Sequence, residues 1–192
     1  MSMTIEALRQ GLVEHDKGVL KGGMHKPEDR EFCALEFSSI MRGKTLTDSP
    51  GDLPDLRPLN DAPWPNDTAR TAALLPVMVA LWDWREWSSK RQAQWAQRVV
   101  IDTVRRIISE LPGLSDLLRI RCHAGTTLNE VKVEAAETEA EAGAWVATGA
   151  WAATAAEAAA WAAGAAKTQT PESVLVTACD IFIQAAQGTE GL

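Results

Sequence analysis

The clearest helix signal in the chain is the stretch SKRQAQWAQRVVIDTVRRIISELPG at residues 89–113. Ser89 and Gln92 have the spacing of a capping box, in which the two side chains satisfy free N–H groups of the first turn. Apolar residues then recur every three or four positions, at Ala93, Ala96, Val100, Val104, Ile107, Ile108 and Leu111. This spacing puts them on one face of a helix, and the Pro-Gly pair after them marks its end. The stretch predicts an amphipathic helix over residues 89–111.

Helix starts are also marked on both sides of this stretch. Pro27 followed by Glu28 and Asp29 is typical of a first helical turn, where proline fits and carboxylates meet the positive end of the helix. The side chains expected on the buried side of this helix are Phe32, Cys33, Leu35, Phe37, Ile40 and Met41. Thr170 and Pro171 start a last helix in the same way. Its expected buried residues are Leu175, Cys179 and Phe182.

No strand signal interrupts these helices. The chain has no Asn-Gly or Asp-Gly hairpin turn and no sustained alternation of β-branched residues. Further helices are expected near residues 4–17, 67–87 and 115–123, and Pro76 should kink the second of these or mark its true start. The sequence therefore predicts an all-α protein, an irregular helical array or bundle.

A long irregular segment is expected over residues 43–67. Five of the nine prolines fall within sixteen residues of it, and proline lacks the N–H that a regular element needs. One helical turn is expected near residues 55–60. We expect residues 1–126 to form a helical domain that contains this Pro-rich loop. Residues 127–192 should form an alanine-rich, acidic helical region that packs on the first part as one unit.

The alanine-rich region predicts one long helix over residues 128–167. Alanine has the highest helix propensity but buries little surface, so this helix should pack closely against others. Three glycines inside it leave open whether it is continuous. Residues 142–166 are also long enough to span a bilayer and contain a single charge. They contain no Leu, Ile or Phe, however, so we favour a close-packed helix in a soluble protein and expect no membrane contact.

The charge of the chain is polarised. The net charge is −7, and residues 127–192 account for all of it, with nine acidic groups against two lysines. Residues 84–126 are locally basic, with eight basic groups against four acidic ones. Such asymmetry is typical of self-complementary packing or of a charged partner for one end. The negative overall charge argues against a generic nucleic-acid coat.

Composition predicts a soluble globular protein of the cytoplasm. Apolar residues make up 46% of the chain and charged residues 23%, which is the balance of a folded domain. The first residues lack the basic start and apolar run of a secretory signal. The three cysteines are far apart and odd in number, so we expect no disulfide framework.

Motifs for catalysis and metal binding are missing from the sequence. It contains no CxxC, HxxxH or HExxH pattern for a metal, no GxSxG for a nucleophile and no glycine-rich phosphate loop. Cys122 and His123 are adjacent, so on a helix they point about 100° apart and do not easily ligate one metal. We therefore expect no metal, no cofactor and no catalytic residue.

Four of the eight tryptophans fall within fourteen residues and lie beside several basic groups. They are Trp82, Trp84, Trp87 and Trp95. Aromatic rings among cations are typical of single-stranded nucleic-acid binding, through stacking and phosphate contacts. The alternative is a solvated basic face whose tryptophans bridge core and surface, and the acidic character of the whole chain favours it. The residues of this candidate interaction face are Trp87, Arg91, Trp95, Arg98 and Arg105, of which the three arginines recur every seven residues and share one side of the helix.

A matching acidic stripe is expected in the alanine-rich helix. It consists of Glu130, Glu134, Glu137 and Glu141. Their spacing of four, three and four residues places them on one helix face, beside a seam of mostly small residues. Such a face suits helix–helix association within the chain or between copies in an oligomer, and a solvated face is the alternative.

A set of short motifs lies within residues 29–80. They are Cys33-Ala-Leu-Glu36, Gly43, Asp48-Ser-Pro50, Leu59-Asn60-Asp61, Arg70 and Leu75-Pro76. In these motifs the chain resembles a family of alanine-rich bacterial and phage-encoded helical proteins of unassigned function, which carry a CxxE helix, an Asp-x-Pro loop and a Leu-Asn-Asp step. Outside residues 29–80 the likeness is one of composition. Members often continue the Asp-x-Pro loop with a cysteine, which this chain lacks, and the family implies no activity.

Four polar residues of these motifs form a candidate cluster. They are Glu36, Asp48, Asn60 and Asp61. Glu36 lies one turn after Cys33, where its carboxylate could accept backbone N–H groups of the long loop. Asp48 and Asn60 suit Asx-turns in the Pro-rich segment. A carboxylate cluster on an irregular loop can instead be catalytic or bind a cation, so both readings stay open, with the structural one preferred.

The leading hypothesis for function is a non-enzymatic helical protein, encoded by a phage or mobile element, that acts through protein–protein contacts or self-association. It rests on the missing catalytic motifs, the polarised charge and the close-packing helix. The first alternative is an enzyme or cation-binding site at the polar cluster. The second alternative is binding of single-stranded nucleic acid by the Trp/Arg helix.

Overall fold

Helices are the regular secondary structure of the computed structural model, which describes residues 3–15, 17–26, 28, 30–48, 51–107 and 170–189. The α-helices of this part of the chain are α1 (Ile5–His15), α2 (Ala34–Met41), α3 (Arg57–Asn60), α4 (Asp67–Ala80), α5 (Ser89–Arg106) and α9 (Pro171–Gln187), and a 3-10 helix, η2, spans Trp84–Glu86. The described residues contain no strand. The prediction of an all-α protein, an irregular helical array, is confirmed.

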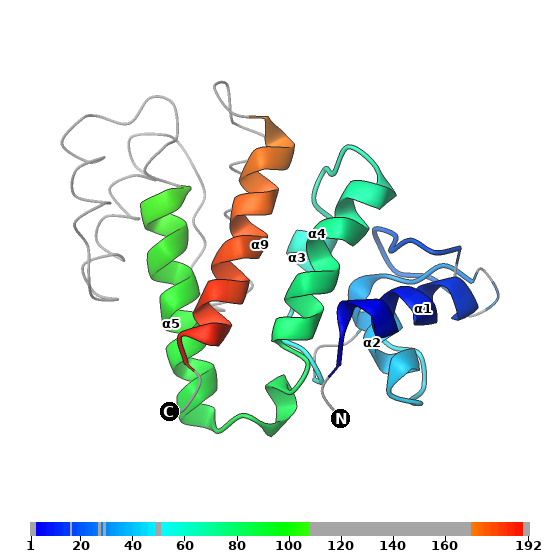
Figure 1. Ribbon diagram of the computed structural model, residues 1–192, viewed down its shortest axis with the longest axis horizontal. Helices are drawn as coiled ribbons and strands as arrows, with labels where there is room; N and C mark the ends of the chain where they lie inside the picture. The colour runs from blue at the N-terminus through cyan, green and yellow to red at the C-terminus, as the bar shows by residue number, and fades with distance from the viewer. Residues whose placement is uncertain are drawn as a thin grey trace.

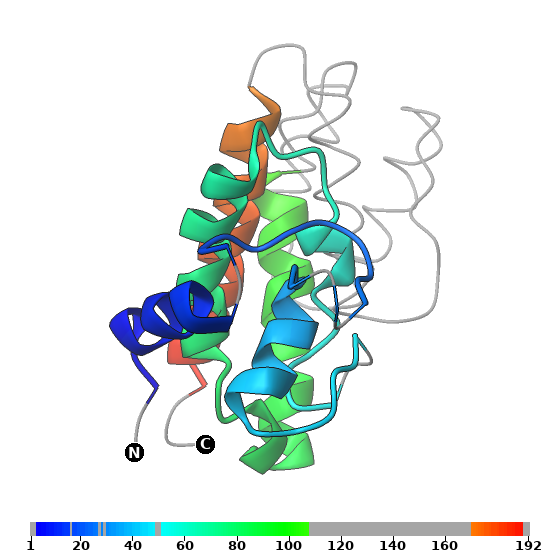
Figure 2. The ribbon, with the colours of Figure 1, turned by 90° about the vertical axis from the view of Figure 1, so that its right-hand side faces the viewer.

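The last helix of the chain lies between two earlier ones. α9 contacts α4 on one side and α5 on the other, although a long stretch of chain separates α9 from α5 (Figure 1). α1 and α2 lie beyond α4 on the side away from α5, and both contact α4. Seen from that side, α1 and α2 stand in front of α4, α9 and α5 (Figure 2). Because α1 runs across α4 rather than along it, the fold is an array and not a regular bundle.

The core is one continuous cluster of buried apolar side chains, to which every described α-helix contributes. Its largest fully buried members are Trp95 of α5, Phe37 of α2 and Phe182 of α9. The Pro-rich loop contributes Leu53, Leu56 and Leu59, each at most 1% exposed. Full burial of a leucine stabilises a fold by about 1.5–3 kcal/mol. These three leucines therefore anchor an otherwise irregular segment to the core.

Three helices begin close to where the sequence predicts. α1 occupies most of residues 4–17, and the Thr4 hydroxyl caps its first turn. α3 is the helical turn expected near residues 55–60. α9 begins at Pro171, and the hydroxyl of Thr170 accepts a hydrogen bond from its first turn. The residues expected on its inner face, Leu175, Cys179 and Phe182, are all buried.

The predicted start of α2 at Pro27 is wrong, because the helix begins at Ala34. Arg30 has a φ of 49°, in the left-handed region, so no right-handed helix passes through it. Cys33 is the N-cap: its Sγ accepts the N–H of Glu36 at 3.5 Å, and the Glu36 carboxylate accepts the N–H of Cys33 at 2.8 Å. The CxxE motif is thus a capping box in which cysteine takes the place of serine. Pro27 itself lies outside the described residues.

α4 ends at Ala80, earlier than the predicted end at residue 87. It passes through Pro76, which is therefore not the start of the helix. After Ala80 the chain turns before η2 begins, and the guanidinium of Arg42 contacts this turn at Trp82. Arg42 donates to the carbonyl oxygen of Trp82 and lies 4.0 Å from the centroid of its ring. The turn is thus held by a residue just after α2, which the local sequence does not reveal.

The first turn of α5 is capped one residue earlier than predicted. The N-cap is Ser88 rather than Ser89, and its hydroxyl accepts the N–H of Arg91 at 3.2 Å. Gln92 does not reach back to the cap, because its amide donates to the carbonyl oxygen of Trp84 at 2.9 Å. The predicted capping box is therefore replaced by a simple serine cap and a tie to η2.

The buried face of α5 also differs from the predicted one. The side chains that it buries at four-residue spacing are Trp95, Val99, Thr103 and Ile107. Of the predicted stripe, Ala93 is exposed and Ala96 and Val100 are half-buried, whereas Ile107 is buried as predicted. The physical reason is size: Trp95 buries far more area against α9 than two alanines could, so it sets the direction in which the helix faces. The helix ends at Arg106, short of the predicted end at Leu111.

Within the described ranges, no helix is both long enough and apolar enough to cross a bilayer. Several predictions concern residues outside these ranges. They are the helix over 115–123, the Cys122-His123 pair, the alanine-rich helix over 128–167 with its membrane alternative over 142–166, and the acidic stripe of Glu130, Glu134, Glu137 and Glu141. These stay predictions.

Candidate functional site

Glu36 lies in the first turn of α2 and is 1% exposed. Its Oε1 accepts the backbone N–H of His25 at 2.8 Å, and its Oε2 accepts the N–H of Cys33 at 2.8 Å. The ring Nδ1 of His25 lies 3.0 Å from the same Oε2. The carboxylate therefore ties the chain that precedes α2 to the beginning of that helix.

Asn60 ends α3 and is also 1% exposed. Its Oδ1 accepts the N–H of Ala34 at 3.1 Å, and its Nδ2 donates to the carbonyl oxygen of Lys21 at 2.9 Å. Asp61 accepts the N–H of Gly23 at 2.7 Å and an N–H of the Asn60 amide at 2.7 Å. The end of α3 thus holds both the segment before α2 and the first turn of α2.

Arg70 of α4 contacts the same region from a further helix. Its Nε donates to the carbonyl oxygen of Asn60 at 2.8 Å, and its guanidinium pairs with Asp67. Asp67 also accepts a hydrogen bond from Lys21 Nζ at 2.6 Å, and this bond lowers the pKa of Asp67 below its usual range. A Cβ placed on Gly22 would lie 3.1 Å from the Arg70 guanidinium, so the backbone approaches Arg70 closely there. We call these side chains the Glu36 network: Lys21, His25, Glu36, Asn60, Asp61, Asp67 and Arg70.

Three of the four residues of the predicted polar cluster belong to this network, and Asp48 does not. Among the described residues no hydrogen bond links Asp48 to Glu36, Asn60 or Asp61, although the charges of Asp48 and Asp61 both act on Arg57. Two expected roles are corrected. Glu36 accepts N–H groups from residues before α2 rather than from the Pro-rich loop, and Asn60 bonds a backbone N–H 26 positions away rather than forming an Asx-turn.

The geometry of the Glu36 network indicates a structural role, in which its hydrogen bonds join separate segments of the chain. A general base or a cation ligand must present a lone pair to a substrate or ion, and Glu36 is buried with both carboxylate oxygens already accepting hydrogen bonds. No group of three or more His, Cys, Asp or Glu side chains in the described part of the chain is placed to hold a metal ion. Burial raises the pKa of the Cys33 thiol to about 12, which disfavours the nucleophilic thiolate.

Sequence reasoning missed three members of the network, His25, Lys21 and Asp67. No local pattern identifies these contacts, because His25 meets Glu36 across eleven positions of the chain and Lys21 meets Asp67 across 46. The motif residues Glu36, Asn60 and Asp61 were identifiable only as short polar motifs. Their contacts depend on how α2, α3 and α4 meet.

Trp95 does not belong to an interaction face. It is 0% exposed, and its ring packs edge-on against Trp84 at 4.9 Å and against Phe182 at 5.2 Å between centroids. Its Nε1 donates to the carbonyl oxygen of Phe182 at 3.1 Å. Trp95 is therefore a core residue that joins α5 to α9, and its assignment to the Trp/Arg face is corrected.

The neighbouring tryptophans are engaged by protein groups as well. Trp84 lies between Trp95 and Trp87, with 5.3 Å between the centroids of Trp84 and Trp87. The guanidinium of Arg91 lies 3.8 Å from the centroid of the Trp87 ring. A cation placed over an indole face is a stabilising contact, and it occupies the surface on which a base would stack.

The three arginines predicted to share one side of α5 differ in exposure. Arg98 is exposed, whereas Arg91 and Arg105 are half-buried. Lys90 near the start of the helix and Arg106 at its end are also exposed. Lys90, Arg98 and Arg106 are spaced by eight residues, so each is turned about 80° from the next and Lys90 and Arg106 lie about 160° apart around the helix. We call these three the α5 basic surface.

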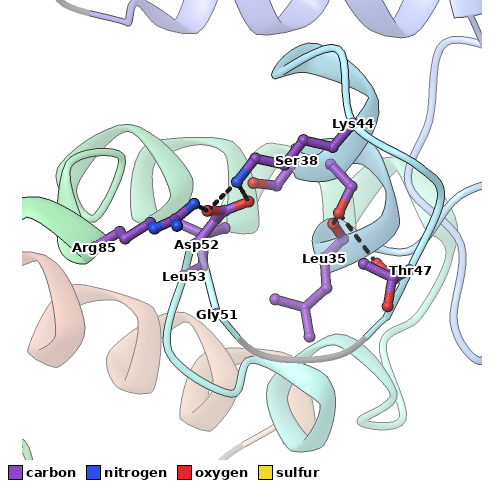
Figure 3. A pocket seen from close by; sticks show the side chains of 9 residues that line it. Leu35, Ser38, Lys44, Thr47, Gly51, Asp52, Leu53 and Arg85 are labelled. Carbon is purple, nitrogen blue, oxygen red and sulfur yellow. Dashed lines mark hydrogen bonds and ion pairs between the residues drawn. The ribbon is translucent and has the colours of Figure 1, made fainter.

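A cavity of about 410 Å³ opens between α2, the Pro-rich loop and Arg85 of η2 (Figure 3). Its lining consists of Leu35, Ser38, Ser39, Lys44, Thr47, Gly51, Asp52, Leu53 and Arg85. Lys44 Nζ lies 2.5 Å from both carboxylate oxygens of Asp52, and Arg85 Nη1 lies 3.3 Å from one of them. The hydrogen bond from Lys44 lowers the pKa of Asp52. The sequence does not indicate this cavity, because its walls come from three separate segments.

Comparison of the chain with family models, with curated proteins and with solved structures finds no match. The residues of this chain therefore carry the inference of function. What they define is an all-α protein with a buried structural network, exposed basic residues on α5 and a cavity with mixed polar and apolar walls.

Proposed function

We propose that this protein acts without catalysis, by binding an acidic surface of a protein partner through the α5 basic surface. The proposal rests on the exposure and the ion pairing of the three cations of this surface. Lys90, Arg98 and Arg106 are exposed, and among the described residues no carboxylate lies within ion-pair distance of any of them. A partner with negative charge would supply the missing counter-charges.

Several other cations of the described chain are instead paired with carboxylates. Lys44 and Arg85 share Asp52, and Arg57 pairs with Asp55. α5 in contrast holds five basic residues and one acidic residue. Exposed like charges on one surface attract a partner of opposite sign and steer its approach, more strongly at low salt. The excess of basic residues on this helix, three of them exposed, therefore favours a binding surface.

The burial and the contacts of the tryptophans favour a protein partner over single-stranded nucleic acid. Base stacking needs a free aromatic face beside the cations. Trp95 is buried and Arg91 covers one face of Trp87. An enzyme or cation site at the polar cluster is disfavoured because Glu36 and Asn60 are each 1% exposed and hydrogen-bonded to protein groups.

The test is a titration of the full chain with a fluorescent polyglutamate peptide, followed by anisotropy at low and physiological salt. We expect binding that weakens with salt, and about threefold to tenfold weaker binding in Arg98→Glu, since one surface charge contributes about 1 kcal/mol. The matched control is Arg9→Glu, an equal charge change at an exposed position of α1. It should leave the affinity unchanged.

Two results would overturn the proposal. Equal losses of affinity in Arg98→Glu and Arg9→Glu would show that net charge alone governs binding and that α5 has no specific binding surface. Tighter binding of an oligothymidylate than of polyglutamate would indicate that the protein binds nucleic acid rather than an acidic protein. Sizing chromatography of the unmixed protein shows in addition whether the acidic partner is a second copy of the chain, because self-association would then weaken in Arg98→Glu.

A further inference from the structure

The cavity beside α2 joins an apolar wall to an excess of positive charge. Leu35 and Leu53 line it and are 4% and 1% exposed, so their side chains face the interior rather than bulk water. Figure 3 shows Leu35 pointing into the space that the Pro-rich loop encloses, with Asp52 between the ends of Lys44 and Arg85. Two cations and one carboxylate leave one net positive charge at this side of the cavity.

The two cations are not held equally. Lys44 Nζ contacts both oxygens of Asp52 at 2.5 Å, whereas Arg85 contacts one oxygen at 3.3 Å. The side chain of Arg85 is 66% exposed, and that of Lys44 is 40% exposed. Lys44 therefore neutralises Asp52, and the guanidinium of Arg85 has N–H groups left for another anion. A guanidinium binds a carboxylate through two parallel hydrogen bonds, which makes this pairing specific in geometry as well as charge.

We propose that this cavity binds a small monocarboxylate with a short apolar tail, the carboxylate on Arg85 and the tail against Leu35 and Leu53. Its volume of about 410 Å³ lies within the range of small-molecule pockets, which combine apolar walls with a few placed polar groups. The hydroxyls of Ser38 and Ser39 bond within the protein, to Arg42 Nε and to the carbonyl oxygens of Leu35 and Thr47, so they shape the wall rather than hold the ligand. This site is separate from the α5 basic surface and does not depend on the proposed function.

The probe is hexanoate, compared with hexan-1-ol, hexylamine and inorganic phosphate, in ¹H–¹⁵N correlation spectra of the full chain. We expect hexanoate to shift the amide signals of cavity residues such as Leu35, Gly51 and Leu53. The three other probes should bind at least about fivefold more weakly, because each lacks either the anionic group or the tail. Arg85→Gln should weaken hexanoate binding about tenfold, as expected for one lost charge-assisted pair. The matched control Arg9→Gln should have no effect.

A second variant blocks the space itself. Gly51 lines the cavity, has no left-handed φ, and a Cβ placed on it meets no atom within 4 Å. Gly51→Leu should therefore leave the melting temperature unchanged, fill the cavity and abolish hexanoate binding. Unchanged hexanoate affinity in Gly51→Leu or Arg85→Gln would overturn the proposal. Equal affinity for hexylamine or phosphate would overturn it too, as would the absence of any shift at about 20 mM hexanoate, which nearly saturates a site with a Kd near 1 mM.

Discussion

Replacing Glu36 by alanine should strongly destabilise the fold without removing any chemistry. The carboxylate is 1% exposed and serves three donors: the backbone N–H groups of His25 and Cys33, and the ring of His25. Alanine satisfies none of them. The expected loss is therefore in the free energy of unfolding, and it comes from backbone groups that lose their acceptor.

The magnitude follows from the burial of each donor. The N–H of Cys33 is buried, and an unsatisfied buried donor costs about 1–3 kcal/mol. The N–H of His25 is part-buried, so water replaces the carboxylate in part and we assign it about 1 kcal/mol. Together these give about 2–4 kcal/mol, a large share of the 5–15 kcal/mol that is usual for a domain. Glu36→Gln keeps one acceptor oxygen and should lose about half as much.

The assay is urea denaturation at neutral pH, followed by circular dichroism and by tryptophan fluorescence. The shift in midpoint gives the change in free energy, provided that the slope m is the same in each variant. The control is Glu86→Ala, an exposed glutamate of η2, which should change the stability by no more than about 0.5 kcal/mol. A Glu36→Ala midpoint equal to that of Glu86→Ala would refute the assignment of Glu36 as a structural tie. It would reopen the reading of the polar cluster as a binding site.

Trp95→Ala should lower the free energy of unfolding by about 3–5 kcal/mol in the same assay, because it removes a fully buried ring that packs against Phe182. A urea midpoint near that of the parent would show that Trp95 is not in the core. The pair of Lys21 and Asp67 should make stability depend on pH. Since Lys21 lowers the pKa of Asp67 in the folded state, the stabilisation is complete above the ordinary carboxyl pKa of about 4 and is lost as the pH falls through the lower folded-state value. The difference in melting temperature between the parent and Asp67→Asn should thus be largest at neutral pH and shrink in acid, and a difference that stays constant would contradict this pairing.

Helix class and several helix ends were predictable because their signals are local. The Thr170-Pro171 start of α9 and the helical turn at α3 depend on φ restrictions and caps within a few residues. The absence of strand signals correctly predicted an all-α protein. In these cases a few adjacent side chains decide the backbone conformation, and the rest of the fold does not alter the result.

The start of α2 shows how a local signal can mislead. Pro27 with two carboxylates is a good helix start in isolation. In the fold, Glu36 binds the N–H groups of both His25 and Cys33, which holds the chain before Ala34 in an irregular path. The capping box of Cys33 and Glu36 is visible in the sequence as the CxxE motif. Cysteine is not a usual N-cap, however, so the motif by itself does not predict a capping box or a helix start at Ala34.

The sequence by itself determined what depends on near neighbours: the helical class, the start of α9, the irregular Pro-rich loop and the uneven distribution of charge. Only the tertiary structure decided which side of α5 is buried, because that choice depends on the area that Trp95 gains against Phe182 of α9, 87 positions away. The same holds for the Glu36 network and for the cavity. Hydrogen bonds and ion pairs act over about 3 Å, so partners that are distant in sequence are set by how the helices pack and leave no periodic or spaced pattern in the chain.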